Sequence, residues 1–461
     1  MYKVFFVFLL TIFLSLPTLA PFSPSARASA AEVQNYEPMQ GYLEAAPSGL
    51  DVRYVWTLAG GHGENVRIID IESDWNFTHS DLLAATLNAL VLIKSTEPQA
   101  QASKDHGAAV IGTLIAAADG KGITGIAYGA QLGMFSPFGA NNAPRIAEAI
   151  NTAVRRLQPG DILLIEQQSP FGPRFDPNTG RGWAPVEVEP DVYEAIKNAT
   201  DKGIVVIEPV GNGFDNLDDP AYRNRFNRNS FDSGAIMVGA GFPPQAYFRQ
   251  GTDLAPTEES NYGSRVDVQG WGRAITTCGF GDLLRNQGED NFYTNSFGAT
   301  SGAAAMVAGA AAVIQSIVKE RGLAPLTSMQ MRQLLAATGT PQTATLNKPI
   351  GSRPNLRAVI TALEANGETP TITSVKYKAG AGKLFVDGEN FIAGDSIIEI
   401  NATRAPKVKY PAEFVLPNGI TTRLMSKGNI SALLPPGVDV QITVFTPSKN
   451  RRSLPFVFRY N

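Results

Sequence analysis

The sequence predicts an α/β protein: a three-layer domain with a mostly parallel central sheet, followed by a small all-β domain. Short apolar runs alternate with helix-like stretches over about residues 50–365, which is typical of a parallel sheet covered on both faces. After residue 368 the runs are β-rich, and Gly, Pro and Asn turns separate them. With 461 residues, the chain is long enough for two or three domains.

The first 30 residues have the pattern of a secretory signal peptide. Lys3 precedes the apolar run Val4–Leu16, and the small residues Ala28–Ala30 follow. A membrane anchor is the alternative, but the run is shorter than the roughly 20 residues that a spanning helix needs. We therefore expect a secreted or extracytoplasmic protein with no membrane span after signal removal. Residues 31–50 form a short polar segment.

The larger, α/β domain is predicted over residues 51–366. Its buried strands are expected at 66–71, 89–93, 131–136, 161–167, 203–209 and 235–241. Helices are expected between several of them, at 106–117, 142–157 and 191–202, and a long Ala-rich helix is expected after a polar loop at 294–319. The Pro-, Gly- and Arg-rich stretch 169–189 and the Asn-, Asp- and Arg-rich stretch 213–234 are predicted loops at the strand ends where ligands bind.

The final domain is predicted over residues 369–461 as an antiparallel β-sandwich. Its strand-like runs lie at 369–377, 383–391, 395–401, 439–447 and 454–460, and none of its segments favours a helix.

Composition excludes several classes of function. The net charge of −3 argues against a nucleic-acid partner. With one cysteine, Cys278, no intrachain disulfide can form. The three histidines, His62, His79 and His106, make a zinc site with several His ligands very improbable, and no His-Glu-x-x-His motif is present.

Four polar residues lie where a strand ends or a helix begins. Asp70 ends the first strand, and His106 follows Asp105 at an expected helix start, where the helix dipole would lower its pKa. Asn212 follows a strand, and Ser301 lies at the start of the Ala-rich helix. The backbone N–H groups of the first helical turn have no acceptor within the helix and can stabilise an anionic oxygen by hydrogen bonds. Taken alone, each residue is explained at least as well as a cap, a turn or a structural side chain, and for Ser301 and His106 that explanation is the better one. Together, in the order Asp, His, Asn, Ser, they indicate nucleophilic catalysis.

The motifs around these residues resemble those of the subtilisin-like serine peptidases (subtilases). The corresponding stretches are Asp70 with Asn76–Leu82, the His-Gly stretch Asp105–Gly112, the oxyanion stretch Val210–Asn212 and the serine stretch Ala299–Gly309. The resemblance covers about residues 50–330. It implies that Ser301 is the nucleophile, His106 the general base, Asp70 the group that orients the imidazole, and Asn212 an oxyanion donor.

The sequence departs from the family pattern at several positions. Ala299 and Ala305 stand where the family usually has Gly and Pro, and Ala108 replaces a Thr. Ile71-Glu72 replaces the usual Ser/Thr-Gly after the aspartate. Ala299 is comfortable only at negative φ, so the serine loop is expected to be shifted slightly. Residues 31–50 are too short for the inhibitory propeptide domain that many secreted subtilases carry.

Substrate and ion binding are less specified. By the resemblance, Glu166–Ser169, with Gln168 and Ser169, and Glu208–Gly211, with Pro209 and Val210, would flank the primary specificity pocket. Glu208 is either a selector of basic side chains or an outward-facing charge. No cofactor is required for the chemistry, and no metal ligand is assigned. Four acids could hold structural calcium or form a solvated loop: Asp215, Asp218, Asp219 and Asp232.

The C-terminal domain resembles immunoglobulin-like domains of the IPT/TIG type. The resemblance lies in Pro370–Ile372 with Val375, Val386–Phe391 and Phe445–Pro447. It implies a binding or spacer role for a ligand that the sequence does not identify.

The whole sequence predicts a secreted serine endopeptidase that acts on proteins or peptides by an acyl-enzyme mechanism. The alternative is a catalytically weak or silent subtilase fold used for extracellular binding or adhesion. An esterase of the α/β-hydrolase type is disfavoured, because the chain order differs and Gly-x-Ser-x-Gly is missing around Ser301.

Overall fold

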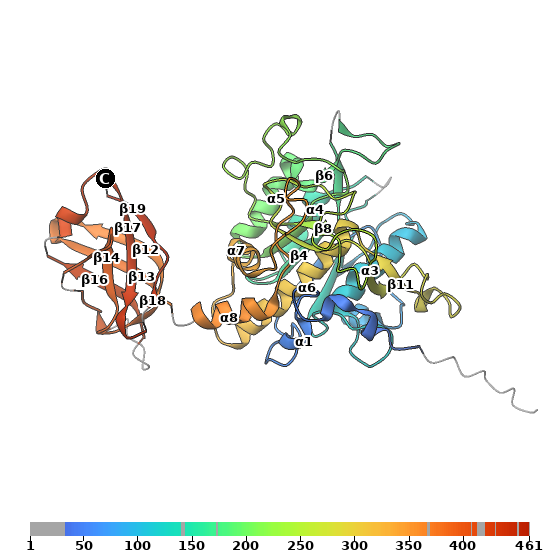
Figure 1. The fold of residues 1–461 in the computed structure, drawn as a ribbon, viewed down its shortest axis with the longest axis horizontal. Coiled ribbons are helices and arrows are strands. Elements are labelled where there is room, and N and C mark those ends of the chain that lie inside the picture. The colour runs from blue at the N-terminus through green and yellow to red at the C-terminus, as the bar shows by residue number, and fades with distance from the viewer. Residues whose placement is uncertain are drawn as a thin grey trace, which may run out of the picture.

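A computed structural model shows an α/β unit followed along the chain by a β unit (Figure 1). It describes residues 33–139, 143–171, 174–366, 369–406, 408–412, 420–428, 430–449 and 451–460. The predicted signal peptide, residues 1–30, lies outside the described residues.

A seven-stranded parallel sheet forms the middle of the α/β unit, in the order β2-β3-β1-β4-β7-β8-β9. Its strands are β1 (Arg67–Ile71), β2 (Leu92–Ile93), β3 (Gln131–Phe135), β4 (Ile162–Ile165), β7 (Val205–Pro209), β8 (Ile236–Gly241) and β9 (Val268–Trp271). Each of the six predicted apolar runs contains one of these strands. The three-layer α/β prediction with a parallel central sheet is therefore confirmed.

Helices cover both faces of the sheet. On one face lie α3 (Gln101–Ile115) and α6 (Ala299–Glu320), and on the other lie α4 (Ile146–Val154) and α5 (Pro190–Asp201). Side chains alternate between the two cores along each strand. In β4, Ile162 and Leu164 pack in the α3/α6 core, whereas Leu163 and Ile165 pack in the α4/α5 core. The same alternation determines which face of the sheet an acidic side chain at the end of a strand occupies.

Helix α3 starts earlier than predicted. Helix α3 begins at Gln101, and Asp105 lies inside it, where its carboxylate accepts a bond of 3.1 Å from Gln101 Nε2 instead of capping the helix. His106 therefore lies in the second turn. Helix α6 is the one helix among the described residues with the length and hydropathy of a membrane span, and 94% of its most apolar window is buried inside the protein.

Shorter elements complete the α/β unit. These are α1 (Val52–Val55), α2 (Leu83–Leu87), β5 (Gln168–Pro170), β6 (Trp183–Pro185), β10 (Ile275–Cys278), β11 (Tyr293–Phe297), α7 (Ser328–Thr338) and α8 (Leu356–Asn366). The N-terminal segment packs against the same unit, since Tyr42, Leu43 and Leu50 are fully buried. The Tyr42 hydroxyl donates to the Thr276 carbonyl at 3.0 Å.

The β unit consists of two antiparallel sheets. One has the order β12-β13-β16, and the other β15-β14-β17-β18 with β19 beside β17. The strands are β12 (Thr371–Lys378), β13 (Lys383–Ile392), β14 (Ile397–Ile400), β15 (Thr403–Arg404), β16 (Ile420–Lys427), β17 (Asp439–Thr446), β18 (Arg451–Arg452) and β19 (Phe456–Arg459). A separate core unites them, with Leu384, Val386, Ile398 and Ile442 fully buried. The sequence missed β16, whose apolar alternation is interrupted.

Candidate active site

The carboxyl ends of three adjacent strands meet the helices α3 and α6. Asp70 lies in β1 opposite Leu164 of β4, and the amide of Glu166 donates to the Ile71 carbonyl at 2.9 Å. Residues 68 and 70 in β1 and 162, 164 and 166 along β4 share the face covered by α3 and α6, since alternate residues of a strand share a face. The sequence therefore places carboxyl groups beneath the helices that carry His106 and Ser301.

Three of the four predicted catalytic residues line one cavity of about 600 Å³: His106, Asn212 and Ser301. The remaining lining residues are Gly272, Arg273, Phe280, Asp282, Ser296, Phe297, Gly298 and Ala299. The Phe297 ring meets the imidazole edge to face, with centroids 5.5 Å apart. The imidazole thus has a fixed wall on one side and an open cavity on another.

Glu72 is the residue that binds the imidazole. Its Oε2 lies 2.5 Å from His106 Nδ1, and its Oε1 accepts from the Ser73 amide at 2.5 Å. The Glu72 side chain is 4% exposed and that of His106 is 31% exposed. Because Nδ1 is engaged by the carboxylate, Nε2 is the ring nitrogen left for proton transfer in the cavity.

Asp70 does not occupy the position expected for it. Its Oδ2 accepts from Trp75 Nε1 at 2.8 Å, and its Oδ1 has no hydrogen-bond partner among the described residues. The physical reason is the strand geometry: Asp70 and Glu72 point to the same side, and Glu72 is longer by one methylene and closer to α3. The prediction that Asp70 contacts and orients the imidazole is corrected accordingly.

The buried carboxyl groups change the pKa of their neighbours. Burial and the adjacent Glu72 charge raise the pKa of Asp70 well above its usual value, against the Trp75 hydrogen bond and His106. Burial lowers the pKa of His106, but the charge and hydrogen bond of Glu72 together with Asp70 outweigh it, so that the pKa is raised. The expected lowering by a helix N-terminus is wrong, because His106 lies in the second turn and faces a carboxylate.

Gly107 allows the loop after Glu72 to lie against α3. A Cβ atom at this position would come within 2.1 Å of the Asp74 carbonyl oxygen and 2.8 Å of the Trp75 ring. Only glycine permits so close an approach. The glycine after His106 therefore has a packing reason: it brings the Asp74–Trp75 segment over Asp70.

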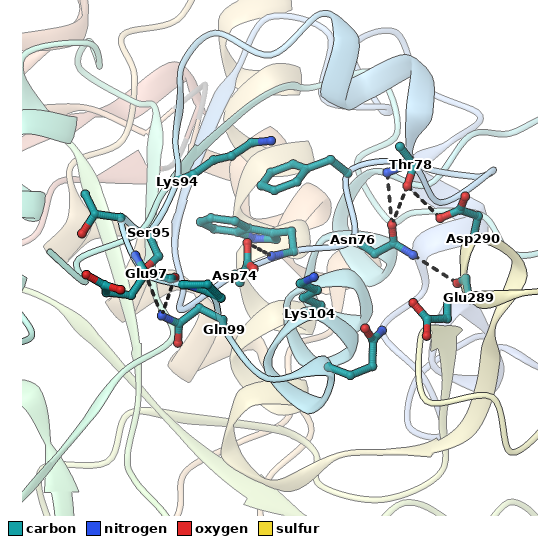
Figure 2. Close-up of a pocket in the computed structure, with 15 residues that line it drawn as sticks. Asp74, Asn76, Thr78, Lys94, Ser95, Glu97, Gln99, Lys104, Glu289 and Asp290 are labelled. Atoms are coloured by element: carbon teal, nitrogen blue, oxygen red, sulfur yellow. Dashed lines mark hydrogen bonds between the residues drawn. The ribbon is translucent and has the colours of Figure 1, made fainter. Parts of the chain in front are cut away.

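A second cavity, of about 500 Å³, lies beside the same loop (Figure 2). One wall is the Asn76–Thr78 segment, where Asn76 Nδ2 donates to the Glu289 carbonyl at 3.1 Å and Thr78 Oγ1 donates to Asp290 at 2.7 Å. The Lys94 ammonium lies 4.1 Å from the centroid of the Phe77 ring. These contacts hold the loop that carries Trp75 in place.

The oxyanion side of the site is formed by Asn212 and the first turn of α6. The Asn212 Oδ1 accepts from the Thr300 amide at 3.2 Å and from Thr300 Oγ1 at 2.9 Å, which leaves its Nδ2 to donate. Gly211 has φ +84°, a conformation that favours glycine. Ser301 lies in the first helical turn, where backbone N–H groups have no acceptor within the helix. Asn212 Nδ2 and the Ser301 backbone amide can therefore both donate to one substrate oxygen.

Ala299 begins α6 with φ +53°, in the left-handed region that side chains avoid. Its amide donates to the Gly272 carbonyl at 2.8 Å. The helix thus keeps the turn that a glycine would adopt, and the strain is stored at Ala299 rather than relieved by a shift to negative φ.

No hydrogen bond joins the Ser301 hydroxyl to His106 among the described residues, although both residues line one cavity; catalytic hydrogen bonds are often long before substrate binds. The Ser301 hydroxyl interacts instead with Glu166. Burial, Asp70 and Glu72 raise the pKa of Glu166 well above its usual value, and the Ser301 hydroxyl is the group that acts against this rise. Neither Glu166 oxygen has a well-formed hydrogen bond.

The residues expected at the specificity pocket do not line the cavity that holds Ser301. Gln168 Oε1 accepts from the Asn212 amide at 2.9 Å, and so supports the oxyanion residue from behind. Ser169 and Pro209 are buried, Val210 is fully buried, and Gly211 supplies the turn before Asn212. Their role in binding substrate stays a prediction.

Glu208 neither faces outward nor lies at the cavity. It follows Ile207 in β7 and shares the α4/α5 face with Val206, fully buried beside Glu187 and Arg265. Burial and the Glu187 charge raise its pKa well above the usual value.

The four acids considered for calcium have protein partners. Asp215 and Asp219 pair with Arg174, Asp232 pairs with Arg332, and Asp218 accepts from Ser264. The described residues hold no group of three or more His, Cys, Asp or Glu side chains that could bind a metal ion. Structural calcium stays a prediction without support from these four residues.

The sequence analysis placed Glu166 beside the specificity pocket and Glu72 in a departure from the motif, but gave neither residue a part in the chemistry. A signal existed for both: each is a carboxylic residue directly after a buried strand, and each has the same parity as the strand residues that face α3 and α6. The proximity of Glu166 to Ser301 could not be predicted, because the two residues are far apart in the chain and are brought together by the packing of α6 on β4.

Comparison with known proteins decides the family. The description of the subtilase family (Peptidase_S8) matches residues 91–355, more than half of the chain. The chain belongs to the subtilase family. The match begins after Asp70 and Glu72, so the acidic part of the site lies outside it.

The subtilase chain is similar to the intracellular serine protease of Paenibacillus polymyxa, at 26% identity over 272 residues, which is 57% of this chain and 70% of that protein. Among solved structures, it is similar to the PatG macrocyclase in complex with peptide (16% identity, TM-score 0.49, 72% and 99% of the two chains). It is also similar to a lanthipeptide protease (18% identity, TM-score 0.49, 71% and 96%). The protein is a subtilisin-like serine peptidase.

Proposed function

We propose that this subtilase is an exported endopeptidase that cleaves proteins or peptides through an acyl-enzyme. Ser301 is the nucleophile, His106 the general base and Glu72 the carboxylate that orients the imidazole. One observation carries the assignment: His106 Nδ1 is held by Glu72 while His106, Asn212 and Ser301 line the same cavity. The nucleophile, base and oxyanion donor therefore have access to one substrate carbonyl.

The chemistry follows from these positions. Ser301 Oγ attacks the peptide carbonyl, and its proton passes to His106 Nε2. Glu72 fixes the tautomer with the proton on Nδ1 and stabilises the imidazolium that forms. The imidazolium then protonates the leaving amine, and a water molecule deprotonated by the same imidazole hydrolyses the ester.

The developing oxyanion would be bound by Asn212 Nδ2 and the Ser301 amide. Thr300 holds the Asn212 oxygen in two hydrogen bonds, so the amide is oriented before substrate arrives. A fixed donor of this kind contributes on the order of 10²–10³ to kcat.

The proposal is tested with a fluorophosphonate probe on the purified full chain, with Ser301→Ala as the control. Labelling of the wild type that is absent from the variant supports an activated serine, and cleavage of an internal bond in a blocked peptide supports endopeptidase action. A folded wild-type protein that is neither labelled nor active would favour the rival function, a silent subtilase fold used for binding.

Export rests on residues 1–30, whose charged start, apolar run and small residues fit a signal peptide. Expression of the full chain and of a chain lacking residues 1–30 tests it. Export is supported when the full chain reaches the medium with an N-terminus just after Ala30 and the shortened chain stays in the cell. Retention of both would contradict it.

The C-terminal unit is proposed to be an immunoglobulin-like binding or spacer module. Its support is two antiparallel sheets around their own core, together with the motif resemblance. The test is a structure of the isolated unit: a Greek-key sandwich supports the assignment, and any other strand connection removes it.

A further inference from the structure

We infer that Glu166 is a further residue of the catalytic centre, whose neutral carboxyl group donates a hydrogen bond to Ser301 Oγ as negative charge develops there. The inference rests on the proposed function, since it assigns a role in the reaction of Ser301.

The first support is position. Glu166 follows β4 directly. Because alternate residues share a face, its side chain lies with those of Ile162 and Leu164 on the face covered by α3 and α6, and Ser301 lies in the first turn of α6. The Ser301 hydroxyl interacts with this carboxyl group, and no hydrogen bond joins it to His106 among the described residues. The Glu166 carboxyl group therefore lies close enough to the Ser301 hydroxyl to interact with it.

The second support is the environment of the carboxyl group. Glu166 is 6% exposed, neither of its oxygens has a well-formed hydrogen bond, and no basic side chain acts on it. Its charged neighbours are the carboxyl groups of Asp70 and Glu72. Burial and these two acids raise its pKa well above the usual value, which favours the protonated form that can donate a hydrogen bond.

The proton balance is simple. The proton of Ser301 moves to His106 Nε2 as Oγ attacks the carbonyl carbon, while the Glu166 proton stays on Glu166 and only its hydrogen bond to Oγ strengthens. The bond weakens again when Oγ becomes an ester oxygen. An interaction that is strongest in the transition state raises kcat more than it changes KM.

Glu166→Gln and Glu166→Met test the inference. Glutamine keeps the shape and a donor, whereas methionine keeps the approximate volume and removes the donor. We expect Glu166→Gln to retain kcat within about threefold, and Glu166→Met to lower kcat by roughly 10²-fold with KM changed by less than about threefold.

Glu208→Gln is the matched control, because Glu208 is an equally buried acid without a well-formed hydrogen bond on the opposite face of the sheet. It should leave kcat unchanged. Thermal unfolding of each variant shows whether the fold is kept, and since Glu166 makes no well-formed bond, its removal should not lower the unfolding midpoint.

The outcomes distinguish failure of the role inferred for Glu166 from failure of the proposed peptidase function. A labelled, active wild type with a Met variant of equal kcat overturns the role of Glu166 and leaves the proposed function intact. A Gln variant as slow as the Met variant also overturns it, because a charge rather than a donor would then be required. A wild type without labelling or cleavage removes both proposals.

Discussion

At the scale of single residues, Glu72 and Asp70 show how one strand can offer two carboxyl groups to one histidine. They lie two positions apart and point the same way, yet Glu72 reaches His106 Nδ1 and Asp70 reaches Trp75 Nε1. The carboxylate in contact with the imidazole is the one that controls its tautomer and its cation.

Glu72→Gln should therefore lower kcat far more than Asp70→Asn. We expect a loss of about 10⁴-fold for the first, as for a lost orienting carboxylate. The second should cost less than about tenfold, because Asp70 contacts Trp75 rather than His106 and Asn keeps an acceptor for Trp75. Steady-state cleavage of one peptide substrate measures both, and the reverse order would restore Asp70 as the orienting group.

The raised pKa of His106 sets the acid limb of the activity profile. The imidazole must be neutral to accept the Ser301 proton, and Glu72 stabilises its cation. The midpoint of the acid limb of kcat/KM is thus expected above pH 6.5, the ordinary value for histidine. Replacement of Glu72 by Gln should move this midpoint to lower pH, and a midpoint that stays in place would show that Glu72 does not control it.

Ala299→Gly should stabilise the protein by about 1 kcal/mol, because glycine adopts φ +53° without strain. Ala303→Gly, in the interior of the same helix, is the matched control and should destabilise by about 1 kcal/mol or more. Denaturant unfolding of the two variants gives both values. Destabilisation by both would mean that the turn at Ala299 carries no strain.

At the scale of elements, the segment that follows Trp75 is joined to the residue just before β11 by a buried histidine, His79. His79 Nε2 lies 2.9 Å from the Phe292 carbonyl oxygen, and the side chain has no exposed surface. Burial lowers its pKa to about 4, so the folded protein holds it neutral where the unfolded chain would bind a proton.

This group should make stability fall with acidification. Its contribution is complete above about pH 6.5 and is lost as pH falls towards 4, with a size of about 3 kcal/mol at most. Burial raises the pKa of the nearby Asp81 to about 6, which changes stability in the opposite direction. The His79 contribution is therefore read from the difference between wild type and His79→Gln, measured by urea unfolding at pH 4 to 7. A difference that does not change over this range would contradict the assignment.

At the scale of the whole molecule, the two units have separate cores, and α8 belongs to the first. Leu356, Val359 and Ile360 of α8 are fully buried in the α3/α6 core, whereas the strands from β12 onward pack around a core of their own. The boundary between independent units thus lies after α8 rather than where the family match ends, at residue 355.

A chain ending at residue 366 should keep the fluorophosphonate labelling rate of the full chain. A chain ending at residue 355 should lose it, because each of the three buried side chains contributes about 1.5–3 kcal/mol, together a large part of a typical domain stability. Labelling and thermal unfolding compare the two. Loss of labelling in the longer chain would show that the β unit supports the catalytic one.

Local periodicity and short motifs were enough to predict the parallel sheet, the helices that cover it and the meeting of His106, Asn212 and Ser301 at one site. These patterns are properties of neighbouring residues, and a single chain displays them directly. The expected shift of the serine loop to negative φ at Ala299 was wrong, because the packing of the helix start keeps the turn that a glycine would adopt.

Tertiary structure alone decided which carboxyl group serves the histidine and which one meets the serine. Both choices depend on distances of a few ångströms between segments that are remote in the chain: β1 with α3 for Glu72, and β4 with α6 for Glu166. Sequence parity fixes the face on which a side chain lies, but side-chain length and the close approach allowed by Gly107 select the contact. For that reason the acid in contact with His106 is Glu72, two residues beyond the one that the motif indicates.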